Sequence, residues 1–153
     1  MKNTKNFINE VHLDFQKKLF TRNRVTCSDV VAEVAREIYT TTNSKIELKE
    51  YFFMIMLNQH NEVIGYIKLG EGGITETTVD SRLAFATALK CLASGIILIH
   101  NHPSSNLSPS INDKLITQRF KEIGKLLNIK VIDHIILTAE NYCSFVEEGF
   151  IKS

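Results

Sequence analysis

Residues 95–103 read GIILIHNHP, an apolar run that ends in two histidines and a proline. The aliphatic residues 96–99 predict a central strand of a sheet, buried on both faces. Side chains two positions apart on an extended chain point to the same side, so His100 and His102 can present two imidazoles to one point. Pro103 prevents regular strand pairing from continuing. The stretch therefore predicts a central strand with half of a metal site at its end.

The polar residues Ser110 and Asp113 follow a short loop that contains both prolines of the sequence. This loop leads into a helix predicted from about Ile111 to Leu127, and Asp113 in its first turn can be a third metal ligand. Two histidines and one carboxylate, with a fourth position left to water, are the donor set of a catalytic zinc centre. An HxH pair alone fits a polar loop equally well, and Ser110 with Asp113 also fits a capping box. The same residues can serve both roles.

The segments on either side alternate between helical and extended patterns. Three helices are expected: from Thr26 or Ser28 to about residue 40, from Asp80 or Ser81 to Ala93, and over 111–127. The expected strands are 51–57, 63–69, 96–99, 131–137 and 142–146. A further short strand is expected in the Thr-rich residues after Gly73. Strand, helix and strand in succession over 63–99 indicate a crossover with some parallel pairing. The sequence therefore predicts an α/β fold in which helices pack against a mixed sheet.

Apolar side chains in the second and third helices predict which helix faces pack on the sheet. The predicted inner face of the second helix consists of Phe85, Leu89 and Leu92. The predicted inner face of the third helix consists of Ile116, Phe120, Ile123 and Leu127.

Length and composition exclude several classes of protein. The chain has 153 residues and a mass of 17.4 kDa, enough for one core and too few for a (β/α)₈ barrel. Eighteen Lys plus Arg against seventeen Asp plus Glu give a net charge of +1, which lends no support to nucleic-acid binding. Three cysteines without a CxxC pair predict reduced thiols. Because no apolar stretch is long enough to span a bilayer and no signal peptide is evident, we expect a cytoplasmic protein without membrane association.

The polar residues resemble a known motif. The pattern His100-x-His102-Pro103-x₆-Ser110-x₂-Asp113 is the JAMM signature of JAB/MPN metalloproteases. The longer string resembles the bacterial RadC-type branch; it comprises HNHPS, Asp133-His134 and Tyr142-x-Ser144-Phe145. The resemblance implies a JAB/MPN fold, similar to that of cytidine deaminases, with a mixed β-sheet flanked by about three helices. It also implies that zinc is held by His100, His102 and Asp113.

The resemblance covers residues 28–153, which we expect to form the JAB/MPN (RadC-like) domain. Residues 1–27 are then an N-terminal extension, in which the alternating run 11–15 fits an edge strand. Typical RadC-type proteins carry an N-terminal helix-hairpin-helix region, for which 27 residues are too few. DNA association attributed to that region is therefore not carried over. Ser105 replaces the branch's usual glycine, and 81–83 read SRL where the branch has Pro-Arg-Glu, which weakens inference about the substrate.

The family also implies a glutamate that holds or deprotonates the zinc-bound water. This glutamate directly precedes the first hydrophobic strand, which selects Glu50, with Glu47 as the weaker alternative. Without the family, Glu50 would be taken for a solvated charge at a strand start. Ser110 matches a serine that stabilises the oxyanion, although its capping role needs no catalysis. Asn101 is expected to point away from the metal and brace the loop. The pair Asp133-His134 either orients a zinc ligand or is a polar pair at a strand edge.

The predicted function is zinc-dependent hydrolysis of amide bonds, in peptides or isopeptides. Zinc brings a bound water to a pKa of about 7, and a neighbouring carboxylate can accept its proton and later donate one to a leaving amine. We expect Zn²⁺ as cofactor and a peptide or protein as substrate, and leave a homodimer open. The alternative is a non-catalytic JAB module that binds a protein or DNA partner in DNA repair or mobile-element biology. Nucleobase deamination is a distant third, because the HxE and PCxxC elements are missing.

Overall fold

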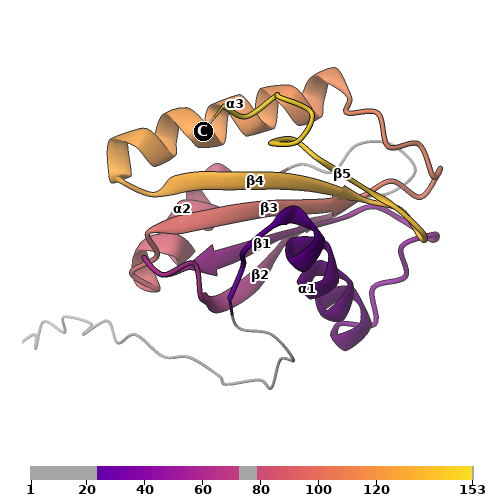
Figure 1. Cartoon of the computed structure of the whole chain (residues 1–153), viewed down its shortest axis with the longest axis horizontal. Coiled ribbons are helices and arrows are strands. Elements are labelled where there is room, and N and C mark those ends of the chain that lie inside the picture. Colours follow the sequence, from indigo (N-terminus) through magenta and orange to yellow (C-terminus); the bar gives the residue numbers. More distant parts are fainter. Residues whose placement is uncertain (1–23, 73–78, 153) are drawn as a thin grey trace, which may run out of the picture.

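The computed structural model describes residues 24–72 and 79–152 of the chain (Figure 1). Within these ranges the helices are α1 (Ser28–Thr41), α2 (Ser81–Lys90) and α3 (Ile111–Leu127), and the strands are β1 (Tyr51–Leu57), β2 (Val63–Glu71), β3 (Gly95–Asn101), β4 (Lys130–Leu137) and β5 (Tyr142–Ser144). The predicted strands at 11–15 and after Gly73 lie outside the described residues. None of the described helices is both long enough and apolar enough to cross a membrane.

The strands form one mixed sheet in the order β2-β1-β3-β4-β5. β1 pairs antiparallel with β2 and with β3, β3 pairs parallel with β4, and β5 is antiparallel to β4. The predicted mixed sheet flanked by about three helices is confirmed. Because β1 lies between β2 and β3, the predicted crossover over 63–99 does not place its two strands side by side. The parallel pairing arises one step later, between β3 and β4, which α3 connects.

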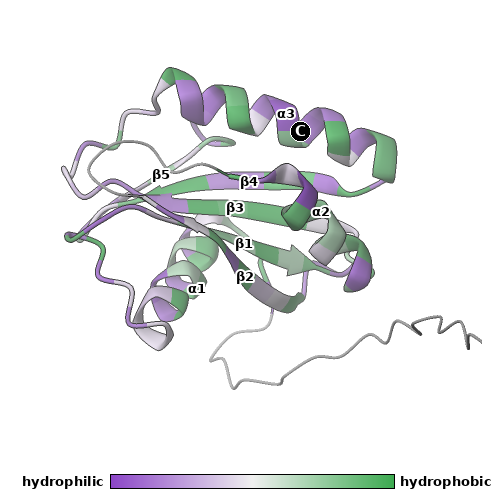
Figure 2. Cartoon of the chain, turned by 180° about the vertical axis from the view of Figure 1, so that it is seen from behind, coloured by the Kyte–Doolittle hydropathy of each residue, from purple (hydrophilic) through white to green (hydrophobic). Residues whose placement is uncertain are grey.

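Alternation along β1 and β3 sorts the apolar side chains into two cores, one on each face of the sheet. On β3, Ile96 and Leu98 pack with residues of α2 and α3, whereas Ile97 and Ile99 pack with residues of α1. Figures 1 and 2 show α1 on one side of the sheet and α2 and α3 on the other. By the same alternation His100 faces α3 and the next residue, Asn101, faces α1. One strand therefore presents polar side chains to both layers.

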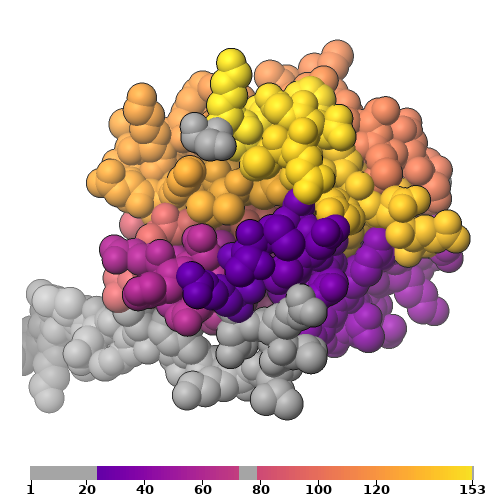
Figure 3. All heavy atoms as spheres, in the orientation of Figure 1, coloured from indigo at the N-terminus to yellow at the C-terminus, as the bar shows by residue number. Residues whose placement is uncertain are grey.

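The N-terminal end of α1 lies against the C-terminal segment of the chain, as the space-filling view shows (Figure 3). Tyr142 Oη donates a hydrogen bond of 2.6 Å to Asp29, and the Ser28 hydroxyl donates to Glu147. The prediction that Thr26 or Ser28 caps α1 is wrong: Cys27 is the N-cap, without a side-chain hydrogen bond. Ser28 is already the first helical residue and its hydroxyl is directed to Glu147 instead.

The predicted inner face of α2 is wrong except for Phe85. The helix ends at Lys90 and not at Ala93, and its buried residues are Ala84, Phe85 and Ala88. Leu89 and Leu92 are 49% and 80% exposed. Two alanines on the inner face keep the helix close to the sheet, so small side chains and not the leucines determine which face is buried.

The predicted bounds of α3 are confirmed, but its inner face is turned from the predicted one. Its buried residues are Asp113, Thr117, Phe120 and Gly124. Ile116 and Ile123 are half-buried at the edge of this face, and Leu127 is 37% exposed. The chain reverses after α3 so closely that the Ile129 amide donates to the Gly124 carbonyl at 2.8 Å. A Cβ at position 124 would lie 2.2 Å from the Ile129 carbonyl oxygen.

Gly124→Ala should therefore destabilise the protein by about 1–3 kcal/mol, because backbone would have to move, although alanine is the better helix former. Gly65→Ala is the matched control, since a Cβ there meets only Met56 Cε at 3.9 Å. The free energy of unfolding from urea denaturation measures both. Equal stability of the two variants would contradict the close approach of α3 to residue 129.

Candidate metal centre

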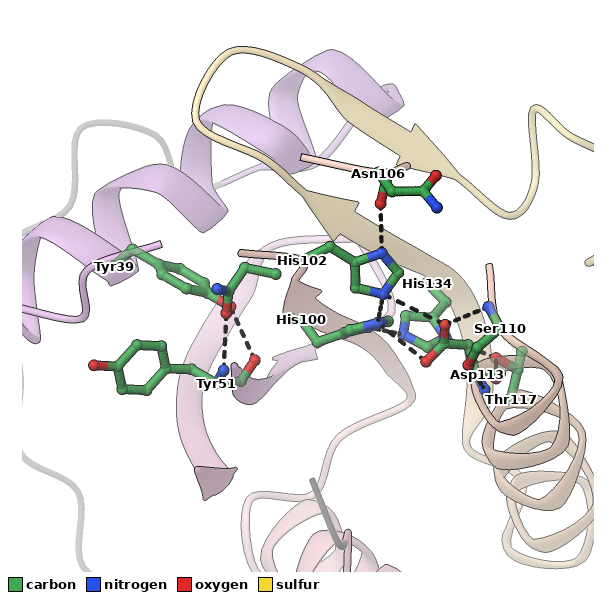
Figure 4. Close-up of polar contacts among 10 residues, drawn as sticks. Tyr39, Tyr51, His100, His102, Asn106, Ser110, Asp113, Thr117 and His134 are labelled. Atoms are coloured by element: carbon green, nitrogen blue, oxygen red, sulfur yellow. Dashed lines mark hydrogen bonds and ion pairs between the residues drawn. The ribbon is translucent and has the colours of Figure 1, made fainter. Parts of the chain in front are cut away.

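Three polar side chains meet where β3 ends and α3 begins (Figure 4). The Nε2 atoms of His100 and His102 are 3.0 Å apart. The Asp113 carboxylate lies 3.1 Å from His100 Nε2 and 3.5 Å from His102 Nε2. One potential ligand atom from each of the three residues lies within 4.8 Å of the other two. The structure thus brings together the three residues predicted as metal ligands; that they bind a metal stays a prediction.

The backbone explains how two segments reach this point. His102 continues the line of β3, because its amide donates to the Leu137 carbonyl of β4 at 2.9 Å. Its side chain therefore lies on the same side as that of His100. Asp113 is fixed by a capping box at the start of α3: its amide donates to Ser110 Oγ at 3.0 Å, and its Oδ2 accepts from the Ser110 amide at 2.7 Å. Capping and the approach to the histidines are compatible.

A chain of hydrogen bonds sets the orientation of His100. Thr117 Oγ1 donates to the Asp113 carbonyl at 2.7 Å, so it must accept the 2.6 Å hydrogen bond from His134 Nδ1. His134 Nε2 then carries no proton and accepts from His100 Nδ1 at 2.8 Å. Complete burial, and next the nearby His100, hold the pKa of His134 well below its ordinary value, which keeps the ring neutral. With its proton on Nδ1, a neutral His100 directs the lone pair of Nε2 at the other two side chains.

His102 is oriented in the same sense by the loop that follows it. Its Nδ1 lies 2.6 Å from the Asn106 carbonyl oxygen, which can only accept, so this nitrogen carries a proton. In the neutral ring Nε2 then offers a lone pair. Two lone pairs and a carboxylate converge, and these acceptors repel one another unless a cation, either a proton or a metal ion, lies among them. Imidazole nitrogen and carboxylate oxygen are donors that suit zinc, so the residues present fit that metal.

The charges at the centre favour a cation. Burial would lower the pKa of His102, but hydrogen bonds that its protonated ring donates to Asp113 and to the Asn106 carbonyl outweigh burial and raise this pKa. Burial would raise the pKa of Asp113, but hydrogen bonds from the two histidines, when their Nε2 atoms carry protons, hold it far below its usual value. The carboxylate is therefore anionic across the neutral range, and His102 binds a proton more tightly than an isolated imidazole does.

A cavity of about 160 Å³ opens beside the three side chains. It is lined by Glu50, Phe52, His102, Ser110, Asn112, Asp113 and Ile116. Glu47 instead lines a separate hollow against α1, together with Arg36 and Tyr39. Of the two glutamates considered from the sequence, Glu50 is therefore the one beside the candidate metal centre. The catalytic roles expected for Glu50 and Ser110 stay predictions.

The side chains of Asp133 and His134 lie on opposite faces of the sheet. His134 contacts His100, as described above, but Asp133 faces away and accepts hydrogen bonds from Ser144 Oγ at 2.6 Å and from the Val146 amide at 3.1 Å. Asp133 therefore orients no ligand. Sequence reasoning missed Thr117, although its position one helical turn after Asp113 places both on one face of α3.

Most of the chain is similar to one family of known proteins. The family profile described as the RadC-like JAB domain matches residues 25–150. A UPF0758 protein of Flavobacterium johnsoniae is 48% identical over 100 residues, which are 65% of this chain and 44% of the relative. UPF0758 proteins of Pelobacter propionicus and Alkaliphilus metalliredigens are 40% and 44% identical over 103 residues, which are 67% of this chain and 45% and 44% of those proteins. The chain thus spans less than half the length of these relatives.

Thr117→Val should weaken zinc binding by about 10- to 100-fold, because it removes the hydrogen bond that fixes the tautomer of His134 and through it that of His100. Thr87→Val is the matched control: in α2, Thr87 Oγ1 donates to the carbonyl four residues earlier at 2.8 Å, as Thr117 does in α3. Competition with a chromophoric zinc chelator gives both affinities. Equal affinities in the two variants would show that the hydrogen-bond chain does not orient the ligand.

Zinc affinity should fall as the pH is lowered toward about pH 6, by about tenfold per unit below the pKa of His102, which lies above its ordinary value of about 6.5. The sign follows from the raised pKa of His102, since a proton on Nε2 competes with the metal. Asp113, with its lowered pKa, stays charged in this range and adds no slope. Chelator competition at each pH measures the affinity, and the free energy of unfolding at the same pH values is the control. A flat profile would contradict ligation through His102.

Proposed function

The chain belongs to the RadC-like JAB domain family, and from this premise we propose that it is a zinc-dependent hydrolase of amide bonds in peptides or isopeptides. The observation that carries the proposal is the convergence of two imidazole nitrogens and one carboxylate beside a cavity. Three protein ligands and an open side are typical of a catalytic zinc centre, whereas a structural one uses four protein ligands. Among the described residues, no other group of three or more side chains was found that could hold a metal.

In this proposal His100, His102 and Asp113 hold the zinc ion. Zinc at this place would supply a Lewis acid that polarises the substrate carbonyl and lowers the pKa of water. Glu50 lines the same cavity as His102 and Asp113. Its carboxylate would take a proton from the attacking water and transfer it to the amine nitrogen as the C–N bond breaks. Both steps are needed for amide hydrolysis.

Ser110 can take part without giving up its capping role. Its Oγ accepts a hydrogen bond from the Asp113 amide, so the hydroxyl proton stays available for donation. Ser110 also lines the cavity, where this proton could stabilise the negative charge that develops on the carbonyl oxygen. Phe52 and Ile116 form apolar parts of the lining of the same cavity.

Glu50→Gln should leave zinc bound and lower turnover by about 10²- to 10⁴-fold, because it removes the proton carrier and no ligand. The assay is cleavage of a fluorescence-quenched peptide library that contains both main-chain amide bonds and lysine isopeptide bonds. Glu47→Gln is the matched control and should change neither property, whereas His102→Ala should lose both zinc and activity.

Two results would overturn the proposal. Wild-type turnover in Glu50→Gln would show that this carboxylate is not the proton carrier. A zinc-loaded protein that cleaves nothing in the library, but binds DNA with a salt-dependent affinity unchanged by Glu50→Gln, would favour the non-catalytic module.

A further inference from the structure

Asn101 lies between the two histidines of the centre, and its side chain makes every hydrogen bond that an amide can make. It is 0% exposed. Its Oδ1 accepts from the Tyr51 amide at 2.8 Å and from Tyr39 Oη at 3.0 Å. Its Nδ2 donates to the carbonyls of Ile46 and Lys49 at 2.7 and 2.8 Å. Two donors and two acceptors are thus all satisfied, in a buried place where an unpaired group would cost about 1–3 kcal/mol.

Two of these hydrogen bonds involve the residues on either side of Glu50. The Lys49 carbonyl precedes this residue and the Tyr51 amide follows it, and Asn101 binds both. The Glu50 carbonyl itself accepts from the Gly72 amide at 2.9 Å. The backbone on both sides of the predicted proton carrier is therefore tied to the strand that carries two of the predicted ligands.

Strand pairing alone does not hold this segment against β3. The antiparallel register of β1 with β3 ends at the pair Phe52 and His100, so Glu50 lies beyond it. The Asn101 side chain extends the connection past the end of that register. Figure 4 shows Tyr39 and Tyr51 on one side of the strand end and His102 and Asp113 on the other. Tyr39 belongs to α1 and also lies 3.0 Å from the Tyr51 carbonyl, so α1 supports the same connection from behind.

We propose that Asn101 is a positioning residue that holds the Glu50 carboxylate beside the metal ligands, through hydrogen bonds to the residues on either side of Glu50. The inference rests on the proposed function, in which Glu50 carries the proton. Under this inference β3 and the residue that continues it have two roles. The side chains that face α3 bind the metal, and the side chain that faces α1 sets the distance from the metal to the proton carrier.

The test compares variants of the full chain loaded with cobalt(II), which takes the same ligands as zinc and has a visible spectrum. Asn101→Leu has similar volume and no polar group, so it removes all four hydrogen bonds without adding a charge, and Tyr39→Phe removes one hydroxyl only. Thr138→Val is the control for the loss of a buried hydroxyl that hydrogen-bonds to Asn141. The readouts are zinc affinity, hydrogen exchange of the Tyr51 amide, and the pH midpoint of the cobalt spectrum.

We expect zinc affinity within about twofold of wild type in all these variants, because none removes a ligand or a hydrogen bond that orients one. Exchange of the Tyr51 amide should rise in Asn101→Leu and not in Thr138→Val. Loss of the carboxylate in Glu50→Gln should shift the spectral midpoint, and Asn101→Leu should shift it in the same direction by at least about half as much. Asn101→Leu should add nothing in the Glu50→Gln background, because the group that Asn101 positions is then gone. Tyr39→Phe should give a smaller shift of the same sign.

Wild-type midpoints in both Asn101→Leu and Tyr39→Phe, beside a clear shift in Glu50→Gln, would overturn the role of Asn101 and leave the proposed function standing. A wild-type midpoint in Glu50→Gln itself would instead show that Glu50 does not act on the metal centre. The role of Asn101 as its positioning residue would then fail together with that part of the proposed function.

Discussion

The repulsion among three hydrogen-bond acceptors is the constraint on which the site depends. Two imidazole nitrogens 3.0 Å apart, with a carboxylate beside them, repel one another unless a cation lies among them. Each group is held there by other contacts: His102 by the Asn106 carbonyl, His100 by His134, and Asp113 by the capping box. Such hydrogen bonds contribute about 1 kcal/mol each, and together they offset the tendency of the three groups to move apart.

The alternation of side chains along β3 brings the predicted parts of the site together. His100 faces α3, which supplies Asp113 at its first turn, while Asn101 faces α1 and the segment that leads to Glu50. Both neighbouring strands hold β3 in place, with β1 antiparallel on one side and β4 parallel on the other. The helix layers therefore contribute different parts: α3 a predicted ligand, and α1 the tyrosine that supports Asn101.

The strands and the convergence of two histidines with Asp113 could be predicted from sequence because their signals are local. The apolar runs 51–57 and 96–99 and the spacing of His100, His102 and Asp113 need no knowledge of distant contacts, whereas the selection of Glu50 needed the family resemblance. The errors depend on packing. Leu89 is exposed because alanines bring α2 close to the sheet, which hydrophobicity does not reveal. The face of Asp133 depends on an irregularity in the register of β3 with β4, which no local pattern shows.

The central claim is that two imidazoles and one carboxylate from this chain bind zinc. X-ray absorption at the zinc edge of the metal-loaded protein tests it most directly, because it reports ligand types and distances without any substrate. The account predicts two imidazole nitrogens and additional oxygen ligands, all at about 2.0–2.2 Å, with no sulfur. A sulfur ligand at about 2.3 Å, or a spectrum without imidazole scattering, would contradict it.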